Sequence, residues 1–347
     1  MSSAANLAKK HRLAFRGWMP IALMGVLIVA VGGYTQSQSS AFLSEFNLNG
    51  LLIATIPLAL AAMGQTSALM VRAFDVSVGA LMTVCVVVAS FTLVAGEPWY
   101  VLLPGAFALI GVGLAVGLFN AFLIKVLGLS SIIATLATLS ILQGIALWLR
   151  PTPEGVINPG VIDALLKSVG FIPIAFIGVV VVAVFADMWL YRSVGGLTAR
   201  AVGLDETSAG RRRARVGYIF VRALFLSALA ASVGAFFLAA QVGVGDPRVG
   251  LGFTLTSIAA AVLGGASLVG GRGSFVGAVV GALFLNVIVN ILPFLGWNTA
   301  YGRMLVGGLT LLALALYQSP ELATRLRTAV SDFRTSRSSA KPATPLE

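Results

Sequence analysis

The sequence predicts an all-α, polytopic membrane protein of about ten transmembrane helices. Hydrophobic residues make up 58% of its 347 residues, charged residues make up only 10%, and the mean hydropathy is +0.98. Soluble domains carry about 25% charged residues, so most of this chain is expected to lie in a bilayer. At about 20 residues per span, plus loops, the length accommodates about ten helices and leaves no separate soluble domain.

Ten apolar runs define the expected spans. They cover residues 18–34, 50–71, 75–95, 100–124, 131–149, 171–191, 216–240, 253–270, 274–295 and 301–317. The first run follows a basic segment, as in a signal peptide, but no small-x-small cleavage site follows it, so we interpret it as a retained helix. The transmembrane domain then extends over 18–317, between an N-terminal tail (1–17) and a polar C-terminal tail (318–347) that we expect to be disordered.

The positive charges lie mainly on one side of the predicted membrane. With the N-terminus inside, 19 of the 23 Lys and Arg residues fall in inside segments. Cytoplasmic loops of membrane proteins carry such an excess, so we expect both termini to be cytoplasmic in a multi-pass protein. The net charge of +11 therefore indicates topology and contact with anionic lipid, not nucleic acid as a partner.

Several classes of active site lack the residues that they need. Cys85 is the single cysteine and His11 the single histidine, which excludes an intramolecular disulfide, a buried His-based metal site and a triad that uses histidine. No Gly-Lys dipeptide occurs, so the phosphate-binding loop that serves ATP hydrolysis is missing. We therefore expect no catalytic residues, no metal and no cofactor in this chain.

Glycines organise the stretch from Thr254 to Leu295. Two apolar runs meet at the short hinge 270–273, after which Gly273, Gly277 and Gly281 recur at every fourth residue. On a helix this spacing puts all three on one face. Because small residues let helix backbones approach closely in lipid, the spacing predicts a helix-packing face.

Polar side chains inside the apolar runs are the candidates for a solute path. Asp75 lies at the start of the third span, where its carboxylate either caps the helix or takes part in gating. Amides in the spans either join helices by hydrogen bonds or line a path for a neutral, hydroxyl-rich solute, since they both donate and accept. These amides are Gln65, Asn120, Gln143, Asn286 and Asn290. The predicted translocation path comprises Asp75, Ser77, Asn120, Asn286 and Asn290.

The long inside loop, 198–215, is the candidate docking surface. Gly203 followed by Asp205 and small residues predicts a short helix with Asp205 as its cap. Such a helix between two spans would face the cytosol and could dock a partner. The alternative is a basic loop held on anionic headgroups, which would suit Arg211, Arg212 and Arg213.

Two spans resemble each other weakly. Val116–Asn120 in the fourth span and Val280–Asn286 in the ninth share a Val-Gly start and an Asn end. Five spans separate them, so they would run in opposite directions. This arrangement suggests an inverted five-plus-five repeat, which is a transporter architecture.

Four blocks of the sequence occur in this order along the chain. They are Phe74–Gly79 (FDVSVG), then Gly117–Asn120 with Ile133–Ser140 and Gly144, then Ala201–Ala209 (AVGLDETSA), and last Ile258–Gly271 with the three periodic glycines. Together they resemble the permease subunits of bacterial ABC importers, in the branched-chain amino acid and monosaccharide group, and most closely the ribose, xylose and arabinose branch. FDVSVG is similar to that branch's IDLSVG, AVGLDETSA to its coupling segment, and the last block to its glycine-rich block.

The resemblance implies a ten-helix inner-membrane permease that works with partner chains. These are a second permease subunit, two cytoplasmic ATPase subunits that bind the ATP, and a periplasmic sugar-binding protein. The solute would be a monosaccharide or related polyol, moved by alternating access. The residues that match the family's ATPase-coupling segment are Gly203, Leu204, Asp205, Glu206, Thr207, Ser208 and Ala209.

The chain departs from the family pattern at a few positions, which bear on the ATPase partner and the sugar more than on the fold. Asp205 stands where the family prefers Asn, Arg212–Ala214 stand where Ser-Gly-Ile is usual, and Arg72 and Phe74 replace smaller or apolar residues beside Asp75. Two other functions also stay open. A branched-chain amino acid permease would have the same architecture, although it would need partners for a charged solute. An ion-coupled secondary transporter would use intramembrane carboxylates, for which only Asp75 and Asp187 are available.

Overall fold

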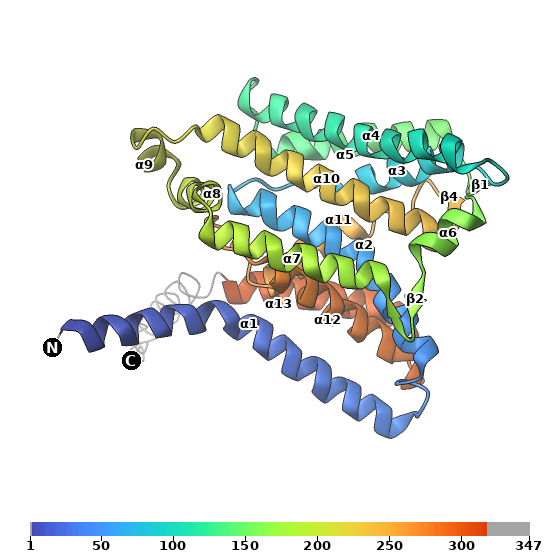
Figure 1. Ribbon diagram of the computed structural model, residues 1–347, viewed down its shortest axis with the longest axis horizontal. Helices are drawn as coiled ribbons and strands as arrows, with labels where there is room; N and C mark the ends of the chain where they lie inside the picture. Colours follow the sequence, from blue (N-terminus) through green and yellow to red (C-terminus); the bar gives the residue numbers. More distant parts are fainter. Residues whose placement is uncertain (1, 318–347) are drawn as a thin grey trace, which may run out of the picture.

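The computed structural model describes residues 2–317, which are predominantly helical (Figure 1). The helices are α1 (Ser2–Gln38), α2 (Glu45–Met70), α3 (Val78–Thr92), α4 (Trp99–Lys125), α5 (Ser131–Leu149), α6 (Pro159–Leu165), α7 (Ile174–Arg192), α8 (Val194–Leu204), α9 (Glu206–Arg211), α10 (Val216–Val242), α11 (Phe253–Leu263), α12 (Phe275–Phe294) and α13 (Ala300–Tyr317). Short strands form two antiparallel pairs, β1 (Glu154–Val156) with β4 (Val244–Gly245) and β2 (Ser168–Val169) with β3 (Ile172–Pro173). The predicted all-α fold is confirmed.

Each predicted span coincides with a helix, and seven described helices are long and apolar enough to cross a membrane. The protein is therefore a polytopic membrane protein. The two helices that fall furthest short of their predicted spans are α3 with 15 residues and α11 with 11. α3 begins late because residues 75–77 form a turn in which the Ser77 N–H donates to Asp75. α11 ends early because Gly265 adopts a φ of +96°, which a right-handed helix cannot contain.

The two ends of the helix bundle differ (Figure 1). At one end lie α8 and α9, and we call this the α8–α9 end. At the other lie β1, β4 and α6, and we call it the β1–β4 end. There Arg150 donates from Nε to the Ser90 Oγ at 2.6 Å, and Glu154 pairs with Gly245 across the two strands.

α2 and α10 form the centre of the bundle. α2 is buried continuously from Thr55 to Met70. A Cβ added to Gly64 of α2 would lie 2.7 Å from the Ser227 carbonyl oxygen of α10, and one added to Gly117 of α4 would lie 2.8 Å from the Ala228 Cβ. Close approach at small residues is how helices associate in lipid, so these glycines hold α2 and α4 against α10.

The predicted glycine face divides between two neighbours. A Cβ at Gly277 or Gly281 of α12 would lie 1.9 Å from the Gly264 carbonyl oxygen or 2.2 Å from that of Ala260, so both glycines pack on the α11 backbone. Gly273 precedes the helix, because α12 begins at Phe275, and its neighbour is Thr66 of α2. The four-residue spacing therefore brings together two glycines on the α11 side, and the third packs elsewhere.

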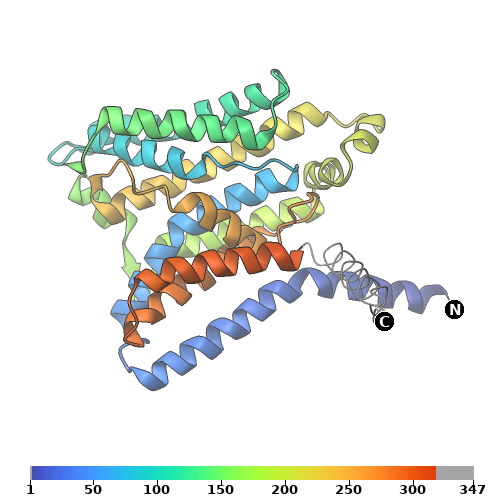
Figure 2. The same cartoon turned by 180° about the vertical axis from the view of Figure 1, so that it is seen from behind.

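The N-terminal helix lies largely apart from the other helices. α1 begins at Ser2, so the helix includes the residues predicted as a tail. It packs on α12 and diverges from the rest of the bundle (Figure 2). The predicted C-terminal tail, 318–347, lies outside the described residues.

Candidate functional site

The predicted coupling segment forms the end of α8 and all but the last two residues of α9. Asp205 separates the two helices and caps α9, accepting hydrogen bonds from the Thr207 and Ser208 backbone N–H groups at 3.0 and 3.1 Å. The Ser208 hydroxyl also donates to this carboxylate, and that bond above all holds the pKa of Asp205 below its ordinary value. Residues 204–208 are all exposed, so the capped helix presents an accessible surface.

Arg72 ties this segment to the bundle. Its Nε donates to the Gly203 carbonyl oxygen at 2.7 Å and to the Val269 carbonyl oxygen at 2.8 Å, and its Nη2 donates to the Leu204 carbonyl oxygen. Arg72 itself has a φ of 62°, which is unusual for a residue with a side chain. One guanidinium therefore joins the end of α2, the end of α8 and the loop that follows α11. We call this set of contacts the Arg72 junction.

Glycines make the Arg72 junction close enough to form. A Cβ at Gly203 would lie 1.8 Å from the Met70 carbonyl oxygen and 2.5 Å from the Gly271 nitrogen. The Gly271 N–H donates to the same Met70 oxygen at 2.9 Å. Gly270 has a φ of +88° and faces the Gly203 carbonyl. The loop after α11 thus contacts α8 through bare backbone.

A second set of predicted residues forms a buried hydrogen-bond network. The hydroxyls of Ser77 and Ser227 donate to Asp75 at 2.6 and 3.0 Å. The Asn120 amide donates to the Ser77 Oγ at 2.9 Å and accepts from Thr138 at 2.7 Å. All five side chains are at most 2% exposed. In this arrangement their polar groups serve to join α3, α4, α5 and α10.

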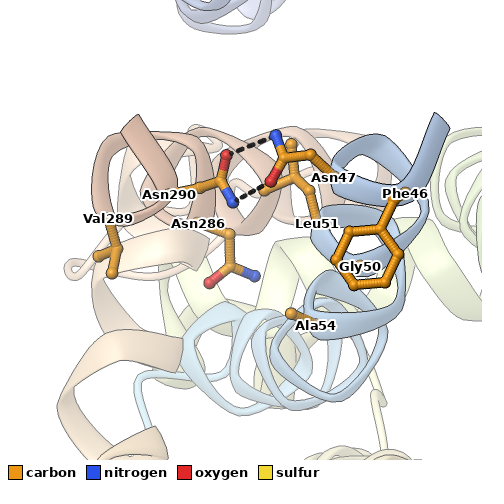
Figure 3. Close-up of a pocket in the computed structure, with 8 residues that line it drawn as sticks. All are labelled: Phe46, Asn47, Gly50, Leu51, Ala54, Asn286, Val289 and Asn290. Atoms are coloured by element: carbon orange, nitrogen blue, oxygen red, sulfur yellow. Dashed lines mark hydrogen bonds between the residues drawn. The ribbon is translucent and has the colours of Figure 1, made fainter. Parts of the chain in front are cut away.

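The remaining predicted residues, Asn286 and Asn290, line a hollow of about 260 Å³ between α2 and α12 (Figure 3). Asn290 and Asn47 exchange two amide hydrogen bonds, of 3.1 and 2.9 Å, and Asn286 donates to the Thr55 Oγ1 at 3.2 Å. The other lining residues are small or apolar, namely Phe46, Gly50, Leu51, Ala54 and Val289. The hollow therefore offers amides and no charged side chain among the described residues.

Two of these features could not be read from local pattern. Asn47 lies at the first turn of α2, just before the predicted span, so a search for amides inside apolar runs misses it. Arg72 stood out only as a departure from the family pattern. Its partners Gly203 and Val269 lie 131 and 197 residues along the chain, and only the tertiary structure brings them to it.

The comparisons with known proteins agree on one class. A family model described as "Branched-chain amino acid transport system / permease component" matches residues 47–314. The autoinducer 2 import system permease protein LsrC of Escherichia coli K12 is 32% identical over 299 residues, which cover 84% of each chain. LsrC of Escherichia coli O157:H7 is 33% identical over 85% of each chain, and LsrC of Salmonella typhimurium is 30% identical over 84% of this chain and 83% of its own. No solved structure matches the chain.

Proposed function

The chain belongs to the family of permease components of branched-chain amino acid transport systems, and from this premise we propose that it forms half of the solute path of an ATP-driven importer for a neutral, hydroxyl-rich solute. A permease component is a transport subunit and not an enzyme, since ATP is hydrolysed by separate ATPase subunits. We expect the solute to be a monosaccharide or related polyol, and the LsrC relatives are named for an import system for autoinducer 2.

The hollow between α2 and α12 is the observation that carries the solute class. Its polar side chains are the amides of Asn47, Asn286 and Asn290. Among the described residues, no charged side chain lines it. An amide donates and accepts at once, as a hydroxyl group requires. A free amino acid carries a carboxylate and an ammonium, and both would lose hydration in this hollow without a partner of opposite charge. The lining therefore favours a neutral solute.

The Arg72 junction supports a role for α8 and α9 in coupling. The exposed, capped α9 offers a surface to a cytoplasmic ATPase subunit, and Lys125 braces it through a 3.0 Å ion pair with Glu206. The excess of basic residues at this end favours a cytoplasmic location, with both termini inside. A movement of α9 would reach α2 and the loop after α11 through the Arg72 guanidinium.

We further propose that the working assembly contains two permease chains, two ATPase subunits and a periplasmic binding protein. Asp75, Ser77 and Asn120 stay predicted path residues, because their present hydrogen bonds are compatible with a second role in another conformation. The inner membrane of a bacterium is the expected location.

Uptake into proteoliposomes tests the proposal. The chain is reconstituted with its ATPase and binding protein, and labelled ribose, autoinducer 2 and leucine are compared with and without ATP. We expect ATP-dependent uptake of a hydroxyl-rich solute, and we expect unlabelled hydroxyl-rich solutes to compete with it. In an Asn290→Leu variant, the KM of this uptake should rise. Asn298→Leu, at an exposed turn outside the hollow, is the matched control.

Leucine is the second candidate, because the family description names branched-chain amino acids. ATP-dependent uptake of leucine alone would overturn the assignment of the solute while leaving the importer role intact. Uptake that ignores ATP and collapses with the proton gradient would overturn both, and Asp75 would then be the carboxylate to examine.

A further inference from the structure

Gln65, in the second half of α2, is a fully buried amide whose hydrogen-bonding capacity is unused. It is 0% exposed, and neither its Oε1 nor its Nε2 has a partner among the described residues. Other amides of the bundle are bonded, as Gln241 is to the Ile53 carbonyl oxygen at 2.8 Å. A buried amide without a partner lowers stability. Such a group is free to bind a partner that the present arrangement of the helices does not supply.

The face of α2 that carries Gln65 is the face that lines the hollow. Gln65 follows Asn47 by 18 residues, which is five turns of an α-helix, so both side chains leave α2 in the same direction. Asn47 belongs to the lining of the hollow. Gln65 is therefore the next amide along this face of α2 toward the α8–α9 end.

Helix α11 packs over this part of α2. Leu69, one turn beyond Gln65, belongs to a buried cluster with Ile258 and Ala261 of α11. Thr254, in the first turn of α11, is 6% exposed, and its Oγ1 also lacks a partner among the described residues. The Thr254 hydroxyl lies beside Gly79 of α3, so α11 carries an unpaired polar group of its own on the side of α3.

α11 has the features of a segment that can move. It has only 11 residues, no side chain caps its N-terminus at Gly252, and Gly265 with its φ of +96° follows its last turn. The loop after it is held by the Arg72 junction, through the Val269 carbonyl oxygen and the Gly271 N–H. A movement of α8 and α9 would therefore pull on the end of α11.

We propose that α11 is a gate that moves away from α2 when the coupling segment moves, and that Gln65, once uncovered, binds hydroxyl groups of the solute. This inference rests on the proposed function. It assigns Gln65 as the inner solute contact of the path and Asn47 with Asn290 as the outer one. The proposal also assigns a role to the Arg72 junction, because the loop held by this junction is directly continuous with α11.

Thiol accessibility tests the gate. Gln65→Cys is made in a chain whose Cys85 is replaced by alanine, and the complete importer in proteoliposomes is treated with a maleimide, with and without ATP. We expect labelling to rise roughly tenfold with ATP, as a shift between two states would produce. The unsubstituted chain is the control, because its Cys85 is buried in α3 and should stay unlabelled in both conditions. Equal labelling with and without ATP, or none at all, would overturn the gate.

Uptake kinetics test the solute contact. Gln65→Leu removes the amide but breaks no hydrogen bond, so we expect KM to rise roughly tenfold while the melting temperature of the purified chain does not fall. Gln65→Asn, which keeps an amide on a shorter side chain, should have an intermediate KM. A lower melting temperature with an unchanged KM would instead assign Gln65 a structural role and would overturn the proposal.

The two levels of inference fail differently. If the wild-type importer takes up none of the hydroxyl-rich solutes, the proposed function fails, and the ATP-dependent labelling of Gln65→Cys still decides whether α11 moves. If uptake is normal but Gln65→Leu leaves KM unchanged, the importer stands and the assignment of Gln65 fails.

Discussion

Replacing Gly203 by alanine tests whether close packing at the Arg72 junction is needed for coupling. The added Cβ would lie 1.8 Å from the Met70 carbonyl oxygen, and real Cβ contacts essentially never fall below 3.0 Å. The end of α8 must therefore move away from α2. This movement stretches the bond from Arg72 to the Gly203 carbonyl oxygen. The added Cβ would also lie 2.5 Å from the Gly271 nitrogen, so it displaces the loop whose Gly271 N–H donates to Met70.

The magnitude follows from these two bonds. A neutral hydrogen bond contributes about 1 kcal/mol and one to a charged group about 1.5–3 kcal/mol. Losing most of both weakens the docking of α8 by at least about 2 kcal/mol, which corresponds to roughly a 30-fold change in an equilibrium constant. The bundle itself keeps its packing, since α8 lies at its end. We therefore expect uptake to fall roughly 30-fold with little change in the amount of protein in the membrane.

The assay is the initial rate of ATP-dependent uptake by the complete importer, with ATP hydrolysis measured in the same vesicles. Hydrolysis should persist in Gly203→Ala, because the variant loses the link and not the ATPase. Gly217→Ala is the matched control, since Gly217 lies at the same end, in the first turn of α10, and nothing is within 4 Å of its added Cβ. Uptake by Gly203→Ala at more than half the wild-type rate would refute the argument that the contact transmits motion.

Three further predictions follow from named contacts. Arg72→Lys should reduce uptake nearly as much as Arg72→Ala, because a lysine ammonium cannot replace the planar guanidinium that reaches three carbonyl groups. Full uptake activity of the lysine variant would contradict this. Asn120→Leu should lower the melting temperature by several degrees. It leaves Ser77 and Thr138 without their amide partner, which costs about 1–3 kcal/mol of the free energy of unfolding. An unchanged melting curve would show that the network adds no stability. Asp205→Asn should keep the cap of α9 and its uptake, whereas Asp205→Ala should lose both. The pKa of Asp205 in the folded protein lies below its ordinary value of 3.8. The carboxylate therefore stabilises α9 fully above pH 3.8, and this stabilisation disappears as the pH falls through the lowered pKa. Hydrogen exchange of residues 205–211 should accordingly accelerate only in strong acid.

The spans were predictable because each depends on a local property. A run of about 20 apolar residues is recognisable wherever it occurs, and all ten runs became helices. The capped α9 was predictable for the same reason, since Asp205 and the N–H groups that it bonds lie within four residues of each other. The short lengths of α3 and α11 were not, because they depend on a side-chain turn at Asp75 and on the backbone conformation of Gly265.

The division of the candidate path residues depended on which helices become neighbours. Asp75, Ser77 and Asn120 meet because α3 begins beside α4 and α10, and Asn286 finds Asn47 and Thr55 nearby because α12 packs along α2. An amide within an apolar run indicates that it has a polar partner, but it does not indicate which helix carries that partner. The sequence therefore identifies these residues as polar groups within apolar runs, and it could not predict that they form two separate groups.

A glycine in the sequence likewise indicates only part of its environment, as the α8–α9 end shows. A glycine in an apolar or loop segment indicates close approach, but the partner has to come from the fold. A Cβ at Gly203 would lie 2.5 Å from the Gly271 nitrogen, and a Cβ at Gly271 would meet the Leu204 side chain, although 68 residues separate the two glycines. Neither glycine alone indicates coupling. In the proposed mechanism their contact, held by Arg72, connects the exposed α9 with α11, and a single added methyl group at Gly203 is expected to break that connection.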